Sequence, residues 1–348
     1  SVRLVRTEAP QAEPLCAEDS SVCLHGGRLR APPPYDGVTT MLRRRTLPEG
    51  ATGRWIRDDG RLILTDHMGN DEPKYDQHNP LLRGTEPVEE PEYLTRAITR
   101  EACRVIEQRG EEPFFLCVSY NAVHSPLQAN TEDLARVPAI EDIHRRIFAA
   151  MLLALDDSIG AITTKLREEG IERQTLILFL SDNGGPTREL TSSNKPLRGG
   201  KGDVYEGGIR VPFVLSQPGV LPSGKLYERP VCSLDFAATA LAVAGVLPEE
   251  ADELDGVDLH PFLTGQRAGS PHEQLFWRMP GRGAVRVGDW KLAAPGLTGK
   301  ETAWELYNLT EDIGETNDLA AERPEVVESL LRRWNAWTAT LPEPIRAD

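Results

Sequence analysis

Four side chains could together bind a metal ion and an anion. Asp182 and Asn183 directly follow a strongly apolar segment, where they offer a carboxylate and a carbonyl oxygen side by side. Such hard oxygen donors suit Ca²⁺ or Mg²⁺. His124 comes shortly after another apolar segment, and Lys201 stands between glycines, where it can present a compact cation to an anionic group. These four residues form our candidate site.

Each part of this candidate site also has an ordinary structural explanation. The sequence Asp182-Asn183-Gly184-Gly185 has the composition of a tight turn, and two oxygen donors alone do not complete a metal site. The glycine-rich segment 194–213 lacks the strand-Gly-x4-Gly-Lys-Ser/Thr-helix order of a P-loop and fits a flexible surface loop. Residue types and spacing therefore leave both interpretations open.

Alternating strand and helix patterns position the candidate residues. Nearly continuous apolar runs predict strands that are covered on both faces, and apolar residues at helical spacing predict helices between them. The predicted strands are 113–120, 175–180 and 211–215, and the predicted helices are 94–106, 140–166 and 234–244. This order favours a mainly parallel sheet covered by helices. Ligands of such sheets bind at the carboxyl ends of the strands, where His124 and Asp182 stand.

The pattern changes after about Pro261. Short alternating runs predict a small antiparallel sheet with strands at 275–278, 284–287, 290–293 and 304–309. An amphipathic helix from Pro324 to about Thr338 is expected to pack on it. We therefore predict three parts: a weakly patterned region at 1–80, an α/β core at 81–262 and an α+β subdomain at 263–348.

Composition excludes several classes of protein. The chain has 348 residues, with 39 Lys and Arg against 54 Asp and Glu, so its formal net charge is −15. This acidic balance disfavours nucleic-acid binding, which needs a basic surface. No run approaches the roughly 18 apolar residues of a membrane span. The five cysteines are scattered without a C-x-x-C pair, so no zinc site or redox dithiol is predicted.

Three longer stretches resemble the second half of a type I, formylglycine-dependent sulfatase. They are Ser181 to Gly185, Pro196 to Gly202 and Glu206 to Pro212. Shorter similarities on both sides extend the resemblance from about Pro80 to the end of the chain. The resemblance implies an alkaline-phosphatase-like α/β fold with a small C-terminal antiparallel sheet. It also implies hydrolysis of sulfate esters, of the arylsulfatase type.

The resemblance assigns a role to each candidate residue. By motif matching, Asp182 and Asn183 would bind the divalent cation, which is usually Ca²⁺ in this family, with Mg²⁺ as the alternative. His124 would contact the sulfate or the leaving oxygen, and Lys201 would neutralise the charge that develops on the sulfate. The substrate would be a small-molecule or glycan sulfate ester. The family implies a periplasmic or extracellular location, although no signal peptide is visible, and the oligomeric state is not predicted.

The sequence departs from the family at the nucleophile. Formylglycine arises from a Cys or Ser in the pattern C/S-x-P-S-R, and no cysteine or serine of the chain fits that pattern. We therefore assign no nucleophile and expect an N-terminally truncated form with impaired or no activity. Two alternatives stay open: a catalytically inactive protein that binds sulfated ligands, and a phosphoester or phosphonate hydrolase of the same superfamily.

Overall fold

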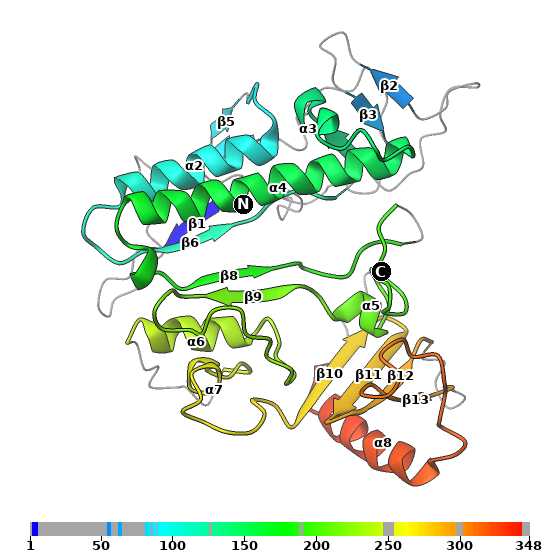
Figure 1. Ribbon diagram of the computed structural model, residues 1–348. Helices are drawn as coiled ribbons and strands as arrows, with labels where there is room; N and C mark the ends of the chain where they lie inside the picture. The colour runs from blue at the N-terminus through cyan, green and yellow to red at the C-terminus, as the bar shows by residue number, and fades with distance from the viewer. Residues whose placement is uncertain are drawn as a thin grey trace. The chain divides into compact units, whose positions relative to one another are not determined.

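The computed structural model describes residues 2–5, 54–56, 62–64, 81–84, 86–88, 90–124, 127–187, 191–245, 254–296 and 302–342. The chain divides into two compact units, Ser1–Glu172 and Arg173–Asp348 (Figure 1). Helices dominate the first unit, and short sheets with a glycine-rich loop dominate the second.

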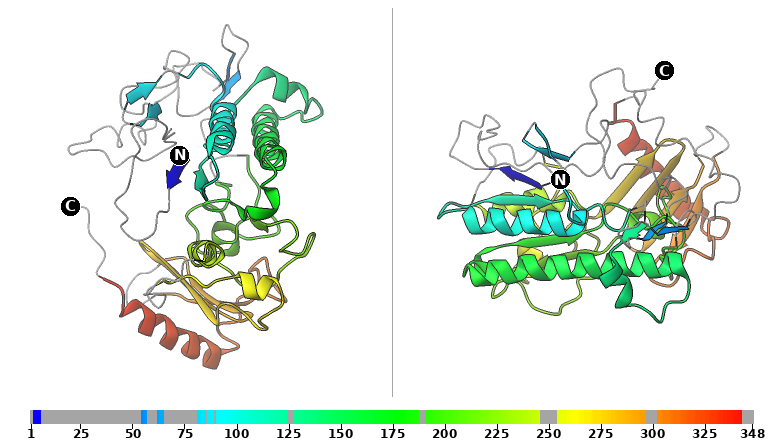
Figure 2. Two further views of the ribbon diagram at one scale, coloured as in Figure 1. Left: turned by 90° about the vertical axis from the view of Figure 1, so that its left-hand side faces the viewer. Right: turned by 90° about the horizontal axis from the view of Figure 1, so that it is seen from above.

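Two long helices form the centre of the first unit. Helix α2 (Leu94–Gln108) packs along α4 (Ile143–Glu168), as Figure 2 shows from above. Ile98 and Ile106 of α2 and Ile147 of α4 are almost completely buried. Ile98, Ala102 and Ile106 of α2 are all buried and follow one another at four-residue spacing, which gave the sequence its helical pattern. Both helices are confirmed within a few residues of the predicted ends.

Helix α4 has a well-defined start and a clear place in the core. The side chain of Asp142 accepts a hydrogen bond from the backbone N–H of Arg145 (2.7 Å), which caps the first turn. By length and composition alone α4 could cross a membrane. Here it packs against α2, α3 (Thr131–Ala135) and β7 (Leu127–Ala129). It therefore serves as a core helix of the first unit.

Short strands surround this helix pair. Strand β1 (Val2–Val5) pairs antiparallel with β6 (Phe115–Val118), and β4 (Leu81–Arg83) pairs with β5 (Glu86–Val88). Strands β2 (Arg54–Ile56) and β3 (Leu62–Leu64) form a three-stranded sheet with β7. Within residues 1–80, where the sequence showed little periodicity, the described segments 2–5, 54–56 and 62–64 are strands. Strand β6 confirms the predicted strand that precedes His124.

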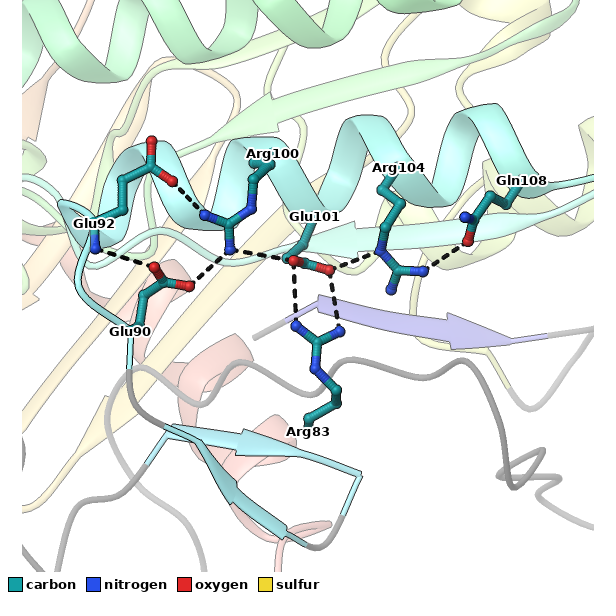
Figure 3. Close-up of polar contacts among 7 residues, drawn as sticks. All are labelled: Arg83, Glu90, Glu92, Arg100, Glu101, Arg104 and Gln108. Atoms are coloured by element: carbon teal, nitrogen blue, oxygen red, sulfur yellow. Dashed lines mark hydrogen bonds and ion pairs between the residues drawn. The ribbon is translucent and has the colours of Figure 1, made fainter.

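A charged network joins β4 to α2 (Figure 3). Glu101 is buried on α2. The guanidinium of Arg83 of β4 donates one hydrogen bond to each of its carboxylate oxygens, both at 3.3 Å. Arg104 adds a third bond at 2.9 Å. Burial alone would raise the pKa of Glu101, but these guanidinium groups lower it to about 2. Arg100 extends the network by bonding Glu90, Glu92 and Glu101.

The second unit opens with a pair of strands that differs from expectation. Strands β8 (Ile177–Leu180) and β9 (Phe213–Ser216) pair antiparallel, whereas the sequence predicted parallel pairing. The backbone N–H of Ser181 donates to the carbonyl of Pro212 at 3.3 Å, so the chain enters β9 beside the end of β8. Helix α5 (Glu206–Ile209) has only four residues and cannot carry the chain back along the strand.

The C-terminal sheet has two differently covered faces. Its strands follow the order β10 (Gln274–Met279), β11 (Arg282–Val287), β12 (Trp290–Ala294) and β13 (Glu305–Asn308), all antiparallel. Helix α8 (Pro324–Thr338) packs on one face and the segment that includes α5 lies on the other (Figure 1).

The other described elements of this unit are the helices α6 (Asp235–Val243) and α7 (His260–Leu263). The 3-10 turn η1 (Glu172–Gln174) begins at the boundary between the units.

Alternation along the strands explains both coverings. On the α8 face, Leu292 and Leu306 pack with Leu330 and Trp334 of the helix. On the opposite face the core is formed by Val204, Tyr205, Ala284, Ala293, Tyr307 and Leu309. Neighbouring residues of one strand therefore belong to different cores. The predicted antiparallel sheet and its packed helix are confirmed.

Replacing Leu330 by Ala tests the helix packing. We expect a loss of about 2–5 kcal/mol in the free energy of unfolding, because a fully packed leucine leaves a cavity beside Trp334. Urea unfolding followed by tryptophan fluorescence measures it. Arg332→Ala on the same helix removes an exposed pair with Glu328 and should change stability by less than about 0.5 kcal/mol. Equal losses in the two variants would contradict this packing.

Candidate functional site

The turn after β8 carries the two predicted metal ligands. The hydroxyl of Ser181 donates to the carbonyl of Asn183 at 2.9 Å, which closes the turn. The Asn183 amide nitrogen donates to the carbonyl of Gly184 at 3.0 Å, so its side-chain oxygen faces away from that bond. Asp182 is exposed, and within the described residues its carboxylate makes no hydrogen bond or ion pair.

Gly184 allows the backbone of a second segment to approach this turn. Its N–H donates to the carbonyl of Gly208 at 3.0 Å. A Cβ at Gly184 would lie 1.7 Å from the carbonyl oxygen of Gly207, a distance that no side chain can occupy. The Asp182-Asn183-Gly184-Gly185 turn is thus built around direct backbone contact with α5, rather than being an isolated surface turn.

The Lys201 loop lies against the same turn. The N–H of Lys201 donates to the carbonyl of Gly185 at 3.2 Å. Gly202 has a φ of +86°, which places the backbone in a conformation that favours glycine. The N–H of Gly200 donates to the carboxylate of Asp203 at 2.9 Å, which closes the loop locally. The structure therefore holds the backbone of Lys201 against the turn that contains Asp182 and Asn183.

Arg198 attaches this loop to the C-terminal sheet. Its guanidinium lies 3.9 Å from the centre of the Tyr205 ring and donates to the Tyr307 hydroxyl at 2.7 Å. Both tyrosine hydroxyls donate to the same carboxylate oxygen of Glu305 at 2.6 Å. Burial and the neighbouring Glu305 raise the pKa of both tyrosines well above the ordinary value.

A buried ionic cluster holds the segment that follows the loop. Lys291 of β12 contacts Glu206 at 2.9 Å and Glu315 at 2.8 Å, and all three side chains are almost completely buried. The second oxygen of Glu315 accepts the backbone N–H of Glu206 at 2.6 Å. Burial raises the pKa of Glu315, and the charge of Lys291 opposes that rise. The start of α5 is therefore fixed to β12 and to the segment around Glu315.

His124 belongs to the first unit. It lies in the turn after β6, where its backbone N–H donates to the carbonyl of Asn121 at 2.7 Å, and its side chain is exposed. Its position at the end of an apolar strand agrees with the placement that the sequence predicted.

A second cluster of titratable groups lies beside α6. Nε2 of His272 is 2.7 Å from Oδ1 of Asp235 and 3.9 Å from Sγ of Cys232. The backbone N–H of Cys232 donates to one carboxylate oxygen of Asp235 at 2.8 Å, and that of Val257 donates to the other at 2.9 Å. Because His272 and Asp235 are in hydrogen-bond contact at 2.7 Å, we interpret the cluster as a hydrogen-bonded ion pair.

This pair shifts both groups in the directions that stabilise their charged forms. The hydrogen bond that His272 donates to Asp235, followed by its contact with Cys232, raises the pKa of His272 to about 9. Burial would raise the pKa of Asp235, but the hydrogen bonds from His272 and from two backbone N–H groups lower it. The pair therefore fixes the start of α6 to the segment that precedes β10.

Comparison with known sequences decides the family. The profile described as Sulfatase matches residues 49–246, which is more than half of the chain. The chain belongs to the sulfatase family. A second profile, described as N-sulphoglucosamine sulphohydrolase, C-terminal, matches residues 200–336 of this sulfatase. The match begins at residue 49, before the position near Pro80 where the sequence resemblance became visible.

Individual relatives and solved structures agree with this assignment. Arylsulfatase J of Mus musculus is 32% identical over 71% of this sulfatase and 49% of its own length. Arylsulfatase A of Homo sapiens is 33% identical over 64% of this sulfatase and 48% of its own length. The structure of Ps i-CgsB in complex with k-i-k-neocarrahexaose has a TM-score of 0.68 at 33% identity, covering 74% of this sulfatase and 58% of that chain.

These comparisons confirm the fold class and show how much of its relatives' length the chain spans. The fold is that of the alkaline-phosphatase-like sulfatases, with the small antiparallel C-terminal sheet and its packed helix. The chain spans about half the length of the two arylsulfatases that it matches.

Sequence reasoning missed the residues that hold the site together. Arg198 and Lys291 have no short-range signal, because their hydrogen-bond partners lie up to 117 residues away along the chain. Asn194 bonds the nearby Gly185 and Gly199, but a contact of a side chain with the backbone of glycines leaves no pattern in the sequence. The glycine density of 194–213 was the signal that existed, since it indicated close backbone approach. The sequence resemblance included Glu206 without indicating that its carboxylate is buried against a lysine.

Removing the charge of Lys291 tests the buried cluster. Lys291→Ala leaves Glu206 and Glu315 as buried carboxylates without their shared cation, and we expect it to cost about 3–5 kcal/mol of unfolding free energy. Denaturant unfolding measures the loss. Lys225→Ala, at an exposed lysine of the same unit, should be nearly neutral. A Lys291→Ala protein as stable as the Lys225→Ala protein would refute the interaction.

The His272–Asp235 pair predicts a dependence of stability on pH. Because the pKa of His272 rises from 6.5 to about 9 on folding, its contribution is fully present below pH 6.5 and is lost as pH rises through about 9. The contribution is on the order of 2–3 kcal/mol. Unfolding curves between pH 6 and 10 should show a loss of stability that His272→Gln removes. Parallel pH profiles for both proteins would exclude the pair as the cause.

Proposed function

We propose that this chain supplies the metal-binding and sulfate-binding part of a sulfatase active site that acts on sulfate esters. The observation that carries the proposal is the hydrogen bond from the N–H of Lys201 to the carbonyl of Gly185. It joins the lysine loop to the turn that holds Asp182 and Asn183. The backbone of Lys201 is thereby held beside the proposed cation site, and a cation and an ammonium group on neighbouring segments suit the binding of a compact oxyanion.

The donor set fits a hard divalent cation. Asp182 has an exposed carboxylate. The amide nitrogen of Asn183 donates to the carbonyl of Gly184, so the side-chain oxygen of Asn183 is the atom that we propose as a metal ligand. We propose Ca²⁺, with Mg²⁺ as the alternative, because both ions take oxygen ligands and Ca²⁺ accepts more of them. These two residues supply only part of the six to eight oxygens that Ca²⁺ binds. When bound, the ion would polarise a sulfate oxygen as a Lewis acid.

The protein's own cation has a separate task. Lys201 lies on a loop whose backbone is held at Gly185 and at Asp203, so its side chain starts from a defined position beside the turn. In sulfate transfer, negative charge accumulates on oxygens around sulfur, and a fixed cation lowers the energy of that state. For His124 we propose the role that the sulfatase resemblance implies, contact with the sulfate or with the leaving oxygen.

Sulfated glycans are the substrate class that we favour. The relative Ps i-CgsB, 33% identical, was solved with a neocarrahexaose, which supports an oligosaccharide ligand for the present chain. Aryl sulfates are useful smaller probes, since arylsulfatases are among its relatives at 32–33% identity.

A second candidate function is binding of sulfated ligands without hydrolysis. It is favoured by one observation: none of the 348 residues falls in a C/S-x-P-S-R motif, so the printed sequence contains no formylglycine precursor. Both candidate functions require Lys201 and the metal-binding turn. They differ only in whether sulfate ester bonds are broken.

The test measures binding and turnover separately. Calorimetry should show Ca²⁺-dependent binding of a sulfated carrageenan oligosaccharide, which Lys201→Ala weakens about tenfold because a charge-assisted contact is lost. Lys225→Ala is the matched control for removal of one positive charge and should bind like the wild type. No heat with the wild-type protein in the presence of Ca²⁺ would overturn the proposal.

Release of nitrophenol from 4-nitrophenyl sulfate then distinguishes the two candidate functions. We expect no release by this chain, given the missing motif. Release that Lys201→Ala abolishes would show a nucleophile outside the C/S-x-P-S-R pattern. Faster release from 4-nitrophenyl phosphate than from the sulfate would instead indicate a phosphoester hydrolase.

A further inference from the structure

The side chain of Asn194 makes three hydrogen bonds to the backbone of the site. Its oxygen accepts the N–H of Gly185 at 3.0 Å, and its amide nitrogen donates to the carbonyls of Gly185 at 2.9 Å and Gly199 at 3.0 Å. The amide therefore pairs with Gly185 through both of its polar atoms and uses its second N–H on the lysine loop. All three bonds have good lengths.

The two loops that Asn194 connects touch each other directly. A Cβ at Gly200 would lie 2.5 Å from the carbonyl oxygen of Gly185 and 3.2 Å from the amide nitrogen of Asn194. A Cβ at Gly185 would lie 3.1 Å from the side-chain oxygen of Asn194. Both positions need glycine for this approach. The asparagine amide thus lies at the junction between the metal-binding turn and the lysine loop.

We propose that Asn194 is a positioning residue that fixes Lys201 relative to the metal-binding turn. This inference rests on the proposed function of Asp182, Asn183 and Lys201. The N–H of Lys201 bonds the carbonyl of Gly185 at 3.2 Å. Asn194 adds an attachment between the turn and the loop at Gly199, two residues before Lys201, while Arg198 attaches the loop to the C-terminal sheet.

Asparagine is the residue that this junction demands. The site needs one acceptor for the N–H of Gly185 and two donors for two carbonyls, which an uncharged amide provides. An aspartate offers acceptors only and would place a carboxylate oxygen against the carbonyls of Gly185 and Gly199. The shorter serine cannot supply two donors.

Coupling between ligands is the property that this positioning role creates. When the turn and the loop move as one body, an ion bound at Asp182 and Asn183 orders the loop that carries Lys201, and the reverse also holds. Calcium should therefore strengthen binding of a sulfated probe by about fivefold or more in the wild-type protein. Loosening the junction should weaken this coupling more than it weakens either single binding event.

The experiment measures coupling in four proteins, the wild type, two Asn194 variants and a control. Calorimetry gives the Kd of a sulfated carrageenan oligosaccharide with and without saturating Ca²⁺ for the wild type, Asn194→Asp and Asn194→Ala. The alanine variant removes the three bonds without adding charge. Asn308→Asp is the matched control, because the Asn308 oxygen accepts one N–H at 3.1 Å in an exposed turn and aspartate can do the same.

We expect the ratio of the two Kd values to fall at least fivefold in both Asn194 variants and to stay unchanged in Asn308→Asp. Circular dichroism melting confirms that each variant is folded at the temperature of the assay. An unchanged ratio in folded Asn194→Ala would overturn the positioning role while leaving the proposed function intact. A wild-type protein that binds neither Ca²⁺ nor the probe would instead refute the proposed function itself.

Discussion

The buried contact of Lys291 with Glu206 and Glu315 is the interaction on which the second unit depends. Two carboxylates and one ammonium group are removed from water, a cost that only their mutual attraction and the backbone bond to Glu206 can offset. The three residues come from α5, β12 and the segment after β13. One ionic cluster thus decides where the C-terminal sheet meets the glycine-rich segment, and the candidate site lies on that segment.

Backbone contact is the second constraint on the site. Gly184 and Gly185 let the turn after β8 touch α5 and the lysine loop without side chains between them. Hydrogen bonds between N–H and C=O groups are short and directional, so they set the position of Lys201 more tightly than contacts between long side chains would. Arg198 then attaches the same loop to Tyr205, Tyr307 and Glu305, so that the loop is held from both sides.

Much of the fold and part of the site follow from the sequence. Helices α2, α4 and α8 show strong apolar periodicity, and the strands before Asp182 and His124 are nearly continuous apolar runs. The antiparallel pairing of β8 with β9 could not be read, because periodicity reports which residues are buried and not which strand lies beside them. The same limit applies to Lys291, whose role arises from a partner 85 residues away. Asn194 has nearby partners, but its hydrogen bonds to the backbone of Gly185 and Gly199 depend on how the loop folds, which periodicity does not report.

The C-terminal sheet carries two cores on one set of strands, and this arrangement makes its register unusually intolerant of insertions. Along β12, the side chains of Lys291 and Ala293 lie on the face that contacts the segment of Glu206. The side chain of Leu292 lies on the opposite, tryptophan-rich face under α8. Adding or deleting a single residue in this strand would move the side chains of each face to the opposite face of the sheet. The ammonium group would enter an apolar core and a leucine would face two carboxylates. Length changes are therefore expected to accumulate in the loops of this subdomain, and not in its strands.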